Sequence, residues 1–246
     1  MEGYGRATYG DAFADVYDRW YGDITDAEGT ADLVADLAGV AGSTRVLELA
    51  TGTGRLALPI AARGLEVLGV DASAAMLARL KERDPAGAIH TVLGDMVEDL
   101  PDGPFGVALI AYNSLFNLDS AQRQRACFAA VAARLAPAGR FIVEAFVPDD
   151  RAGPAVSVRS MTATEVVLSI SEHDVGEQRA HGQFVQFVDG ERVRLRPWSI
   201  RYAGPAELDE MAAAAGLELV DRWADVLRHP YGEECPQHVS VYGLTR

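Results

Sequence analysis

Residues 46–54 of this 246-residue chain read Val46-Leu-Glu-Leu-Ala-Thr-Gly-Thr-Gly54. The stretch 46–49 is typical of a buried strand, and the glycines behind it permit a tight turn into a helix. Such a turn brings the backbone close to a ligand, and the helix that follows presents free N–H groups. We therefore expect Gly52 and Gly54 to form the centre of a binding site.

Short apolar runs alternate with helical segments on both sides of this turn. Strands are predicted at 46–49, 66–70, 89–93, 107–111, 141–145, 217–222 and 238–244, with helices at 55–63, 73–82, 121–135 and 205–215. The order repeats the βαβ unit, which builds parallel sheets covered by helices. We predict an α/β fold, a Rossmann-like seven-stranded sheet with helices on both faces.

Two further regions flank the predicted core. Residues 11–21 place aromatic and apolar side chains on one face of a single helix, and a second helix is expected at 27–37. Residues 155–161, 166–172, 183–188 and 192–197 alternate like antiparallel strands, and Asp189-Gly190 predicts a type I′ hairpin turn. An antiparallel β layer is therefore expected as an insertion after the fifth strand.

The whole chain is expected to form one domain, because single cores grow to about 250–300 residues. Within it we expect a helical cap at 1–40, a cofactor-binding core at 41–150, the inserted layer at 151–203, and a C-terminal helix with the last strands at 204–246. The insertion is expected to form a substrate lid or a surface for a homo-oligomer.

The composition of the chain limits which binding partners and which cellular location are expected. A formal charge of −14 repels phosphate backbones, so nucleic acid is not expected, whereas a cationic small molecule would be attracted. The longest apolar stretch, 107–118, is shorter than the ~20 residues of a membrane span, and no secretory signal precedes the first helix. We expect a cytoplasmic protein. Cys127 and Cys235 do not have the spacing of a zinc site, and no metal is expected.

A carboxylate follows the second predicted strand. Asp71 stands where an acidic side chain can accept hydrogen bonds from both ribose hydroxyls of a nucleoside cofactor. The glycine turn also fits a dinucleotide fingerprint, so an NAD-dependent oxidoreductase is an alternative. Its common short-chain form uses a Tyr-x-x-x-Lys pair, but Lys81 is the single lysine and Leu77 stands four residues before it. A non-catalytic binding module is another alternative.

Several motifs in order resemble those of the class I S-adenosylmethionine-dependent methyltransferases. The stretch 46–54 is similar to the family's first motif, with Ala50 in place of the common glycine or cysteine, and 70–73 resembles the second. Gly94-Asp95-Met96 resembles the third motif. The segment 111–117 occupies the family's position for residues near the transferred methyl group, and 135–143 resembles the turn into the fifth strand.

This resemblance implies S-adenosylmethionine as cofactor and assigns residues to it. They are Tyr17, Glu48, Ala50, Gly52, Gly54, Asp71, Ala72, Met76, Asp95, Met96, Ala111 and Asn113. Asp95 would meet the exocyclic amine of adenine and Met76 would pack on its ring. Without the resemblance, Asp95 would cap a turn and Met76 would belong to the core. Glu48 is expected to order the glycine loop or to receive the cofactor's ammonium group.

The N-terminal tyrosines, the segment 113–117 and the insertion together resemble small-molecule N-methyltransferases of antibiotic pathways that act on amino sugars or lincosamides. This likeness implies three catalytic residues, Tyr9, Tyr17 and Phe116. Tyr17 would contact the methionine end of the cofactor, and Tyr9 and Phe116 would border the acceptor. We accordingly expect Phe116→Ala to impair turnover. Trp20 is expected instead to fasten the N-terminal helix.

The class of methyl acceptor can be inferred from whether a general base is present near the predicted site of methyl transfer. A neutral amine has its lone pair ready, whereas an alcohol must lose a proton to a base or a metal-bound group. The segment 112–117 contains no histidine and no acidic metal cluster. We expect methylation of a small-molecule amine, with O-methylation of a hydroxyl or carboxylate as the alternative. The later histidines, at 173, 181, 229 and 238, are candidates for a base but are more often solvent-facing.

Overall fold

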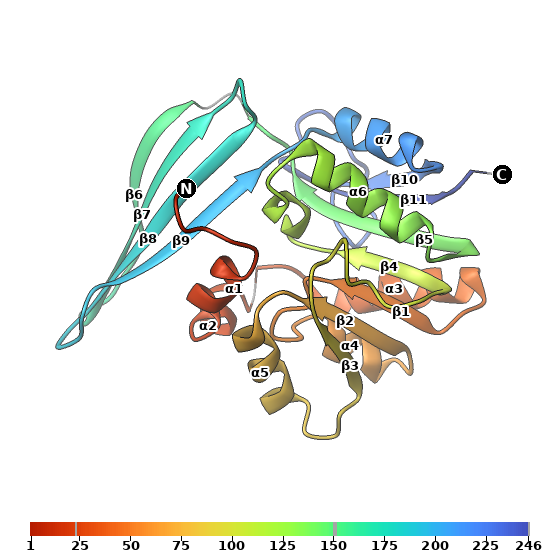
Figure 1. The fold of residues 1–246 in the computed structure, drawn as a ribbon, viewed down its shortest axis with the longest axis horizontal. Helices are drawn as coiled ribbons and strands as arrows, with labels where there is room; N and C mark the ends of the chain where they lie inside the picture. Colours follow the sequence, from red (N-terminus) through yellow and green to blue (C-terminus); the bar gives the residue numbers. More distant parts are fainter. Residues whose placement is uncertain (23, 150–151, 246) are drawn as a thin grey trace.

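The computed structural model describes residues 1–22, 24–149 and 152–245. A seven-stranded sheet with helices on both faces forms its body (Figure 1). Its strands are β1 (Arg45–Leu49), β2 (Glu66–Asp71), β3 (Ile89–Leu93), β4 (Phe105–Ile110), β5 (Leu135–Phe146), β10 (Leu217–Trp223) and β11 (Gln237–Leu244). The helices around it are α3 (Ala27–Ala41), α4 (Ala57–Ala62), α5 (Ala74–Arg83), α6 (Ala121–Ala132) and α7 (Pro205–Ala214).

The strand order is β10-β11-β5-β4-β1-β2-β3, in which β11 alone pairs antiparallel with both of its neighbours. Strands β1 to β5 pair in parallel. The predicted α/β fold is thus confirmed. The chain winds outward from β1 to β3 and then returns beside β1 as β4, so a crevice opens beyond the carboxyl ends of β1 and β4.

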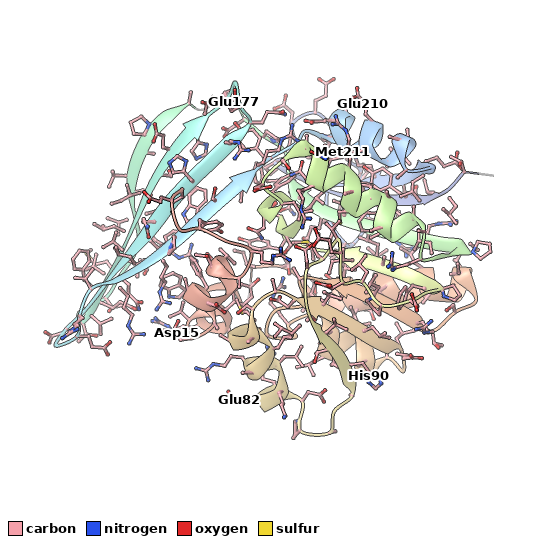
Figure 2. The ribbon with its side chains drawn as sticks, in the orientation of Figure 1. Asp15, Glu82, His90, Glu177, Glu210 and Met211 are labelled. Atoms are coloured by element: carbon pink, nitrogen blue, oxygen red, sulfur yellow. The ribbon has the colours of Figure 1, made fainter. Side chains whose placement is uncertain are left out.

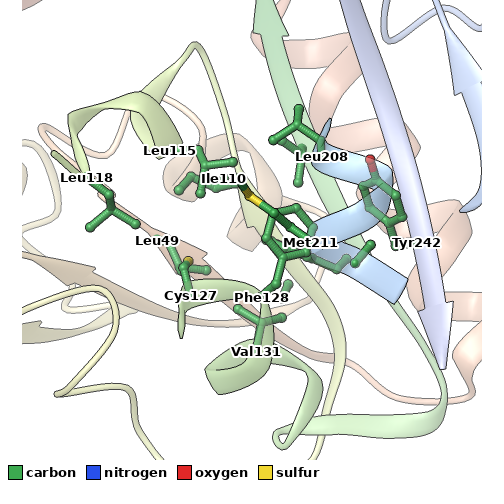
Figure 3. Packing of buried hydrophobic residues seen from close by; sticks show 14 of the residues in the cluster. Leu49, Ile110, Leu115, Leu118, Cys127, Phe128, Val131, Leu208, Met211 and Tyr242 are labelled. Atoms are coloured by element: carbon green, nitrogen blue, oxygen red, sulfur yellow. The ribbon is translucent and has the colours of Figure 1, made fainter. Parts of the chain in front are cut away.

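Helices α6 and α7 cover one face of the sheet. There Phe128 makes edge-to-face contacts with Phe141 and Tyr242, at centroid distances of 5.2 and 5.6 Å. Cys127 lies fully buried in the same cluster (Figure 3). The other face packs against α3 and α4 through residues such as Val34 and Ile60. In the described ranges no helix is both long and apolar enough to cross a bilayer.

The expected antiparallel layer is a separate sheet beside this body (Figure 1). Its strands pair in chain order and are β6 (Gly153–Met161), β7 (Glu165–Asp174), β8 (Arg179–Val188) and β9 (Arg194–Arg201). The expected boundary between core and insertion falls on residues 150 and 151, which lie outside the described residues.

The turn between β8 and β9 differs from the predicted type I′ geometry. The Glu191 N–H donates to the Val188 carbonyl, which closes a turn around Asp189-Gly190. Gly190 has a φ of +75°, but Asp189 is not among the positive-φ residues, so only one central position is left-handed. The ladder resumes at Arg194, which makes a longer loop that does not require the mirror-image turn.

The N-terminal segment forms two short helices, α1 (Thr8–Phe13) and α2 (Tyr17–Tyr21), where the sequence predicted one. The Val16 N–H donates to the Phe13 carbonyl rather than to that of Ala12. The Ala12 carbonyl instead accepts a hydrogen bond from Arg196 of β9. A side chain far along the sequence thus satisfies the carbonyl that a continuous helix would have used.

Two element boundaries also differ from prediction, because the chain enters the sheet early. Helix α6 ends at Ala132 instead of residue 135, and β5 begins at Leu135 instead of residue 141. The Arg134 carbonyl accepts a 2.8 Å hydrogen bond from the Phe105 N–H at the start of β4. This bond joins the two segments seven residues before the apolar run, beginning at residue 141, that suggested the fifth strand.

Trp20 fastens the N-terminal helices, as expected, but it holds them to the inserted sheet. Its ring lies 5.8 Å from that of Phe184 in β8. A bulge in β6 directs the Arg159 guanidinium over the rings of Trp20, Tyr21 and Phe184, at 5.0, 4.8 and 5.0 Å. The helices α1 and α2 and the face of the inserted sheet that they cover are therefore one packed unit.

His238 of β11 makes folding stability depend on pH. Its side chain is fully buried, Nδ1 lies 2.9 Å from Ser240 Oγ, and Nε2 has no hydrogen-bond partner among the described residues. Burial, reinforced by the positive charge of Arg222 and opposed by Asp209, lowers the pKa of His238 from 6.5 to about 4. Below pH 6.5 the unfolded chain therefore takes up a proton that the folded protein resists.

We predict that the preferential protonation of His238 in the unfolded chain lowers the free energy of unfolding by about 3 kcal/mol as the pH falls from 6.5 to 4. His238→Gln should flatten that pH dependence, because glutamine does not titrate. Urea unfolding at a series of pH values measures the difference, with the exposed His90→Gln as the control. Equal pH slopes for wild type and His238→Gln would contradict the assignment.

Candidate cofactor and acceptor site

A cavity of about 420 Å³ opens at the carboxyl ends of the parallel strands. Its walls come from the loops after β1, β2 and β3, from the 3₁₀ helix η1 (Ser114–Asn117) that follows β4, and from the N-terminal segment. Nine residues predicted from the sequence line it: Tyr9, Tyr17, Ala50, Gly52, Asp71, Ala72, Met76, Asp95 and Met96. Residues from four separate loops and the cap thus meet at the topological switch point.

The glycine turn after β1 requires left-handed backbone at three positions. Ala50, Gly52 and Gly54 have φ values of +55°, +59° and +79°. A Cβ at Gly52 would meet only the Ala50 carbonyl, at 4.0 Å, so the space in front of this backbone is open to a ligand. A Cβ at Gly54 would lie 2.9 Å from the Leu80 side chain. Gly54 therefore lets the turn pack on α5 and does not line the cavity.

Asp71 ends β2 with its carboxylate held in place. Oδ2 accepts the Gly52 N–H and Oδ1 accepts the Ser73 N–H, both at 2.8 Å. Burial raises the pKa of Asp71, and these two backbone donors oppose that rise. Each oxygen keeps a second lone pair, so the oriented carboxylate can receive a pair of ligand hydroxyls. This geometry fits the ribose of an adenosine cofactor.

Asp95 caps a turn and also forms a salt bridge. Oδ1 accepts the backbone N–H groups of Val97 and Glu98, at 2.9 and 3.2 Å. Arg123 of α6 lies 2.6 Å from both carboxylate oxygens, and Arg6 is 3.5 Å away. The turn-capping role, which the sequence left open, is thus present in the structure, and an adenine amine would share this carboxylate with Arg123.

Glu48 lies beneath the glycine turn and does not line the cavity. It is buried, and its Oε2 accepts a 2.6 Å hydrogen bond from the Thr51 hydroxyl. Desolvation raises the pKa of Glu48 to about 7, although Thr51 and the charge of Arg55 oppose the shift. Of the two roles considered for Glu48, the geometry supports ordering of the loop.

Tyr9 and Tyr17 line the cavity from α1 and α2. The Tyr9 ring stacks on Phe13 at a centroid distance of 4.4 Å, and the Tyr9 hydroxyl is hydrogen-bonded to Tyr21. Burial raises the pKa of Tyr9 well above its usual value and that of Tyr17 to about 12, with Arg55 opposing the shift of Tyr17. Both phenols are therefore neutral near pH 7.

Phe116 does not border the cavity, contrary to expectation. Its side chain is fully buried and packs edge-to-face on Phe146 of β5, with ring centroids 5.1 Å apart. Ala111 is also buried, and Asn113 uses its Oδ1 to accept the Phe146 N–H at 2.7 Å. Phe116 and Asn113 thus fix the segment after β4 to β5. The 3₁₀ turn directs Phe116 inward and leaves Ser114 on the wall, together with Asn117, Leu118 and Asp119.

The remaining walls come from residues that were not predicted from the sequence: Tyr4, Gly5, Arg6, Gly10, Val70, Ser73 and Arg123. Ser73 could have been found, since Asp71-Ala-Ser73 precedes a helical pattern and the Ser73 hydroxyl caps α5 by accepting the Met76 N–H. Arg123 carries no local signal, because only the packing of α6 brings it to Asp95.

None of the candidate histidines lines this cavity. His181 and His229 lie beside surface carboxylates, Glu172 and Asp225, and His238 is buried in the sheet. His173 faces a second cavity of about 570 Å³ between the end of β5 and the inserted sheet. Within 1–22, 24–149 and 152–245, no three His, Cys, Asp or Glu side chains are grouped to hold a metal ion.

Comparison with known proteins places the chain in a family. Residues 46–139 match the model of a methyltransferase domain. The CcbJ methyltransferase from Streptomyces caelestis is 37% identical, superposes with a TM-score of 0.90, and is matched over 99% of this chain and 100% of its own. No curated protein sequence matches the chain.

Two more distant structures share the fold. CalS10, an amino pentose methyltransferase from Micromonospora echinaspora solved with bound S-adenosylmethionine, is 23% identical with a TM-score of 0.72, over 94% of this chain and 97% of its own. The sugar N-methyltransferase KedS8 from Streptoalloteichus is 21% identical with a TM-score of 0.71, over 100% and 99%.

The match to CcbJ spans both sheets and the N-terminal helices, so it extends well beyond the glycine turn that a nicotinamide enzyme would share. The oxidoreductase alternative is thereby set aside, and S-adenosylmethionine is the cofactor that the oriented Asp71 carboxylate fits. The chain belongs to the S-adenosylmethionine-dependent methyltransferases.

Proposed function

We propose that this methyltransferase acts on the amine nitrogen of a small molecule, an intermediate of antibiotic biosynthesis. The observation that carries the proposal is a pair of neutral, half-buried tyrosines, Tyr9 and Tyr17, on the wall of the cofactor cavity. The described residues that line the cavity include no histidine that would serve as a base. Such a site suits an acceptor that already carries a free lone pair.

S-adenosylmethionine supplies an electrophilic methyl group bound to a sulfonium sulfur. The chain's task is to hold this donor and align the acceptor, since in-line displacement depends on orientation. Asp71 and the open backbone of Gly52 would hold the nucleoside, and Ala72, Met76 and Met96 offer apolar surface to the base. Aromatic faces stabilise a nearby cation by about 0.5–2 kcal/mol.

Tyr9 distinguishes an amine from an alcohol. Its raised pKa keeps the hydroxyl protonated, so it is unsuited to removing a proton from an alcohol. The same oxygen retains lone pairs that can accept a hydrogen bond from an amine N–H and orient the nitrogen. An exposed carboxylate on the wall, Asp119, and the net charge of −14 would attract a cationic amine. The names of CalS10 and KedS8, which specify sugar substrates and, for KedS8, N-methylation, support the same choice.

A panel of acceptors tests the proposal directly. The protein would be incubated with methyl-labelled S-adenosylmethionine and small amines, alcohols and carboxylates, including amino sugars and cyclic secondary amines. We expect label on nitrogen, with a rate that rises as the acceptor amine deprotonates, because only the neutral amine has a free lone pair. Label found on oxygen acceptors alone would refute N-methylation.

Asp71→Ala should weaken binding of S-adenosylhomocysteine at least 100-fold, because it removes the acceptor proposed for the ribose hydroxyls. Titration calorimetry measures the affinity, and circular dichroism shows whether the turn survives the loss of the partner of Gly52. The exposed Asp102→Ala is the matched control and should bind as the wild type does. An affinity within threefold of wild type in Asp71→Ala would exclude this role.

Tyr9→Phe and Phe116→Ala should affect different properties: the first should lower activity and the second should lower stability. Tyr9→Phe keeps the ring on Phe13, so kcat/KM should fall at least tenfold while the free energy of unfolding stays within about 1 kcal/mol of wild type. Phe116→Ala empties a fully buried site and should cost about 3–5 kcal/mol of unfolding free energy. Steady-state kinetics and urea unfolding separate the two. A stable Phe116→Ala protein with selectively lost turnover would restore the expectation drawn from the sequence.

A further inference from the structure

The carboxylate of Asp95 on the cavity wall can accept few further hydrogen bonds. An ionised carboxylate offers about four lone-pair positions. Oδ1 accepts the backbone N–H groups of Val97 and Glu98, and one guanidinium nitrogen of Arg123 lies 2.6 Å from both Oδ1 and Oδ2. The exposed Arg6 is 3.5 Å from Oδ2. Among the described residues, these donors leave Oδ2 with room for a single hydrogen-bond donor from a ligand.

Arg123 determines the orientation of this carboxylate. Both backbone bonds end on Oδ1, so they constrain the position of Oδ2 only weakly. The contact of Arg123 with both oxygens fixes the plane of the group. A second guanidinium nitrogen donates to Glu98 Oε1 at 2.6 Å, so Arg123 is itself held at two points. The planar donor set of an arginine is suited to such a double contact.

Arg123 stands at a position where a helix does not favour a cation. The first turn of α6 reads Ala121-Gln122-Arg123, and the Arg123 N–H donates to the Ser120 hydroxyl that caps the helix. Helix N-termini carry partial positive charge and favour acidic side chains. The contact with Asp95 and Glu98 therefore has to offset an unfavourable placement, which indicates that the arginine serves the loop at 94–99.

Helix α6 supports this loop at a second point. Cys127 lies one turn after Arg123 on the same face of the helix, and its Sγ is 3.9 Å from the Met96 carbonyl. On its other side α6 packs through Phe128 into the main core, where Met211 of α7 lies next to it (Figure 2). A side chain on a helix that is packed in this way is well placed to orient a neighbouring group.

The purine base of the cofactor carries a matching donor. The exocyclic amine of adenine donates a hydrogen bond, whereas hypoxanthine, the deaminated base, has at the same position an oxygen that only accepts. A fixed carboxylate with one remaining acceptor position would bind the amine and repel the oxygen. We propose that Arg123 is a positioning residue that makes the enzyme selective for adenine over 6-oxopurine in the cofactor, because it orients Asp95.

Titration calorimetry with S-adenosylhomocysteine and its deaminated analogue, S-inosylhomocysteine, tests this proposal. The wild-type protein should bind the adenine compound about 100-fold more tightly, since a site that pairs with an N–H group rejects an analogue without it. In Arg123→Met this preference should fall at least tenfold, mainly through weaker binding of S-adenosylhomocysteine. Arg123→Lys should give an intermediate preference, because a compact ammonium group keeps the charge but not the planar double contact.

Arg63→Met is the matched control. Arg63 bridges Glu28 and Asp32 as Arg123 bridges its two carboxylates, and the two arginine side chains are 21% and 29% exposed. Arg63 is not among the described residues that line the cofactor cavity, so its variant should keep the wild-type preference. Circular dichroism reports whether each variant is folded, and Arg123→Lys is the milder change if Arg123→Met is not.

A second series tests whether the arginine acts through Asp95. Asp95→Ala should abolish the preference for adenine. Adding Arg123→Met to Asp95→Ala should then change the ratio of the two affinities less than threefold, because coupled residues are not additive. A tenfold further change would show that Arg123 acts on the base by another route and would contradict the positioning role.

Three other results would overturn the inference. A wild-type protein that binds both compounds equally would show that Asp95 does not read this position of the base. A preference that stays within threefold of wild type in folded Arg123→Met, even if both affinities fall, would leave the arginine a structural role only. A preference that rises would show that Arg123 opposes selectivity. Because none of these measurements uses a methyl acceptor, their failure is distinguishable from failure of the proposed N-methylation.

Discussion

The carboxylate of Asp71 joins the two turns on which the cofactor site depends. The turn after β1 needs left-handed backbone at Ala50, Gly52 and Gly54, and Ala50 pays a steric penalty there that glycine would avoid. Asp71 holds this turn through the Gly52 N–H and positions the start of α5 through the Ser73 N–H. Since β1 and β2 are adjacent parallel strands, the sheet itself brings these groups together. The same bonds that stabilise the fold thus leave the carboxylate oriented toward the cavity.

Local patterns were sufficient to predict the seven-stranded sheet, the inserted sheet and the family, because strand periodicity and the glycine turn are encoded by neighbouring residues. They failed where distant residues decide the outcome. Arg196 captures the Ala12 carbonyl and divides the N-terminal helix, and Arg123 reaches Asp95 from α6. The 3₁₀ turn buries Phe116 although its position in the family motif suggested a cavity wall. None of these pairings has a signature within its own segment.

The inserted sheet serves two environments because a strand presents alternate residues to opposite sides. Toward the N-terminal helices it presents polar and cationic groups, among them Arg159 and Arg196, that bond to backbone carbonyls and aromatic rings. Toward solvent it presents apolar side chains, among them Val156, Val158 and Leu195. A one-residue change in strand register would exchange the two sets, so the arginine contacts also fix which face is outermost.

The union of the N-terminal helices with the inserted sheet limits how this enzyme can be recombined with its relatives. Residues that line the cofactor cavity, such as Tyr9 and Tyr17, stand on helices whose packing partners, Phe184 and Arg196, lie more than 160 positions later in the chain. A chimera that exchanged the insertion alone would pair one enzyme's helices with another's arginines. The exchangeable module is therefore discontinuous in sequence, and a transplant of acceptor preference would have to carry α1, α2 and β6–β9 together.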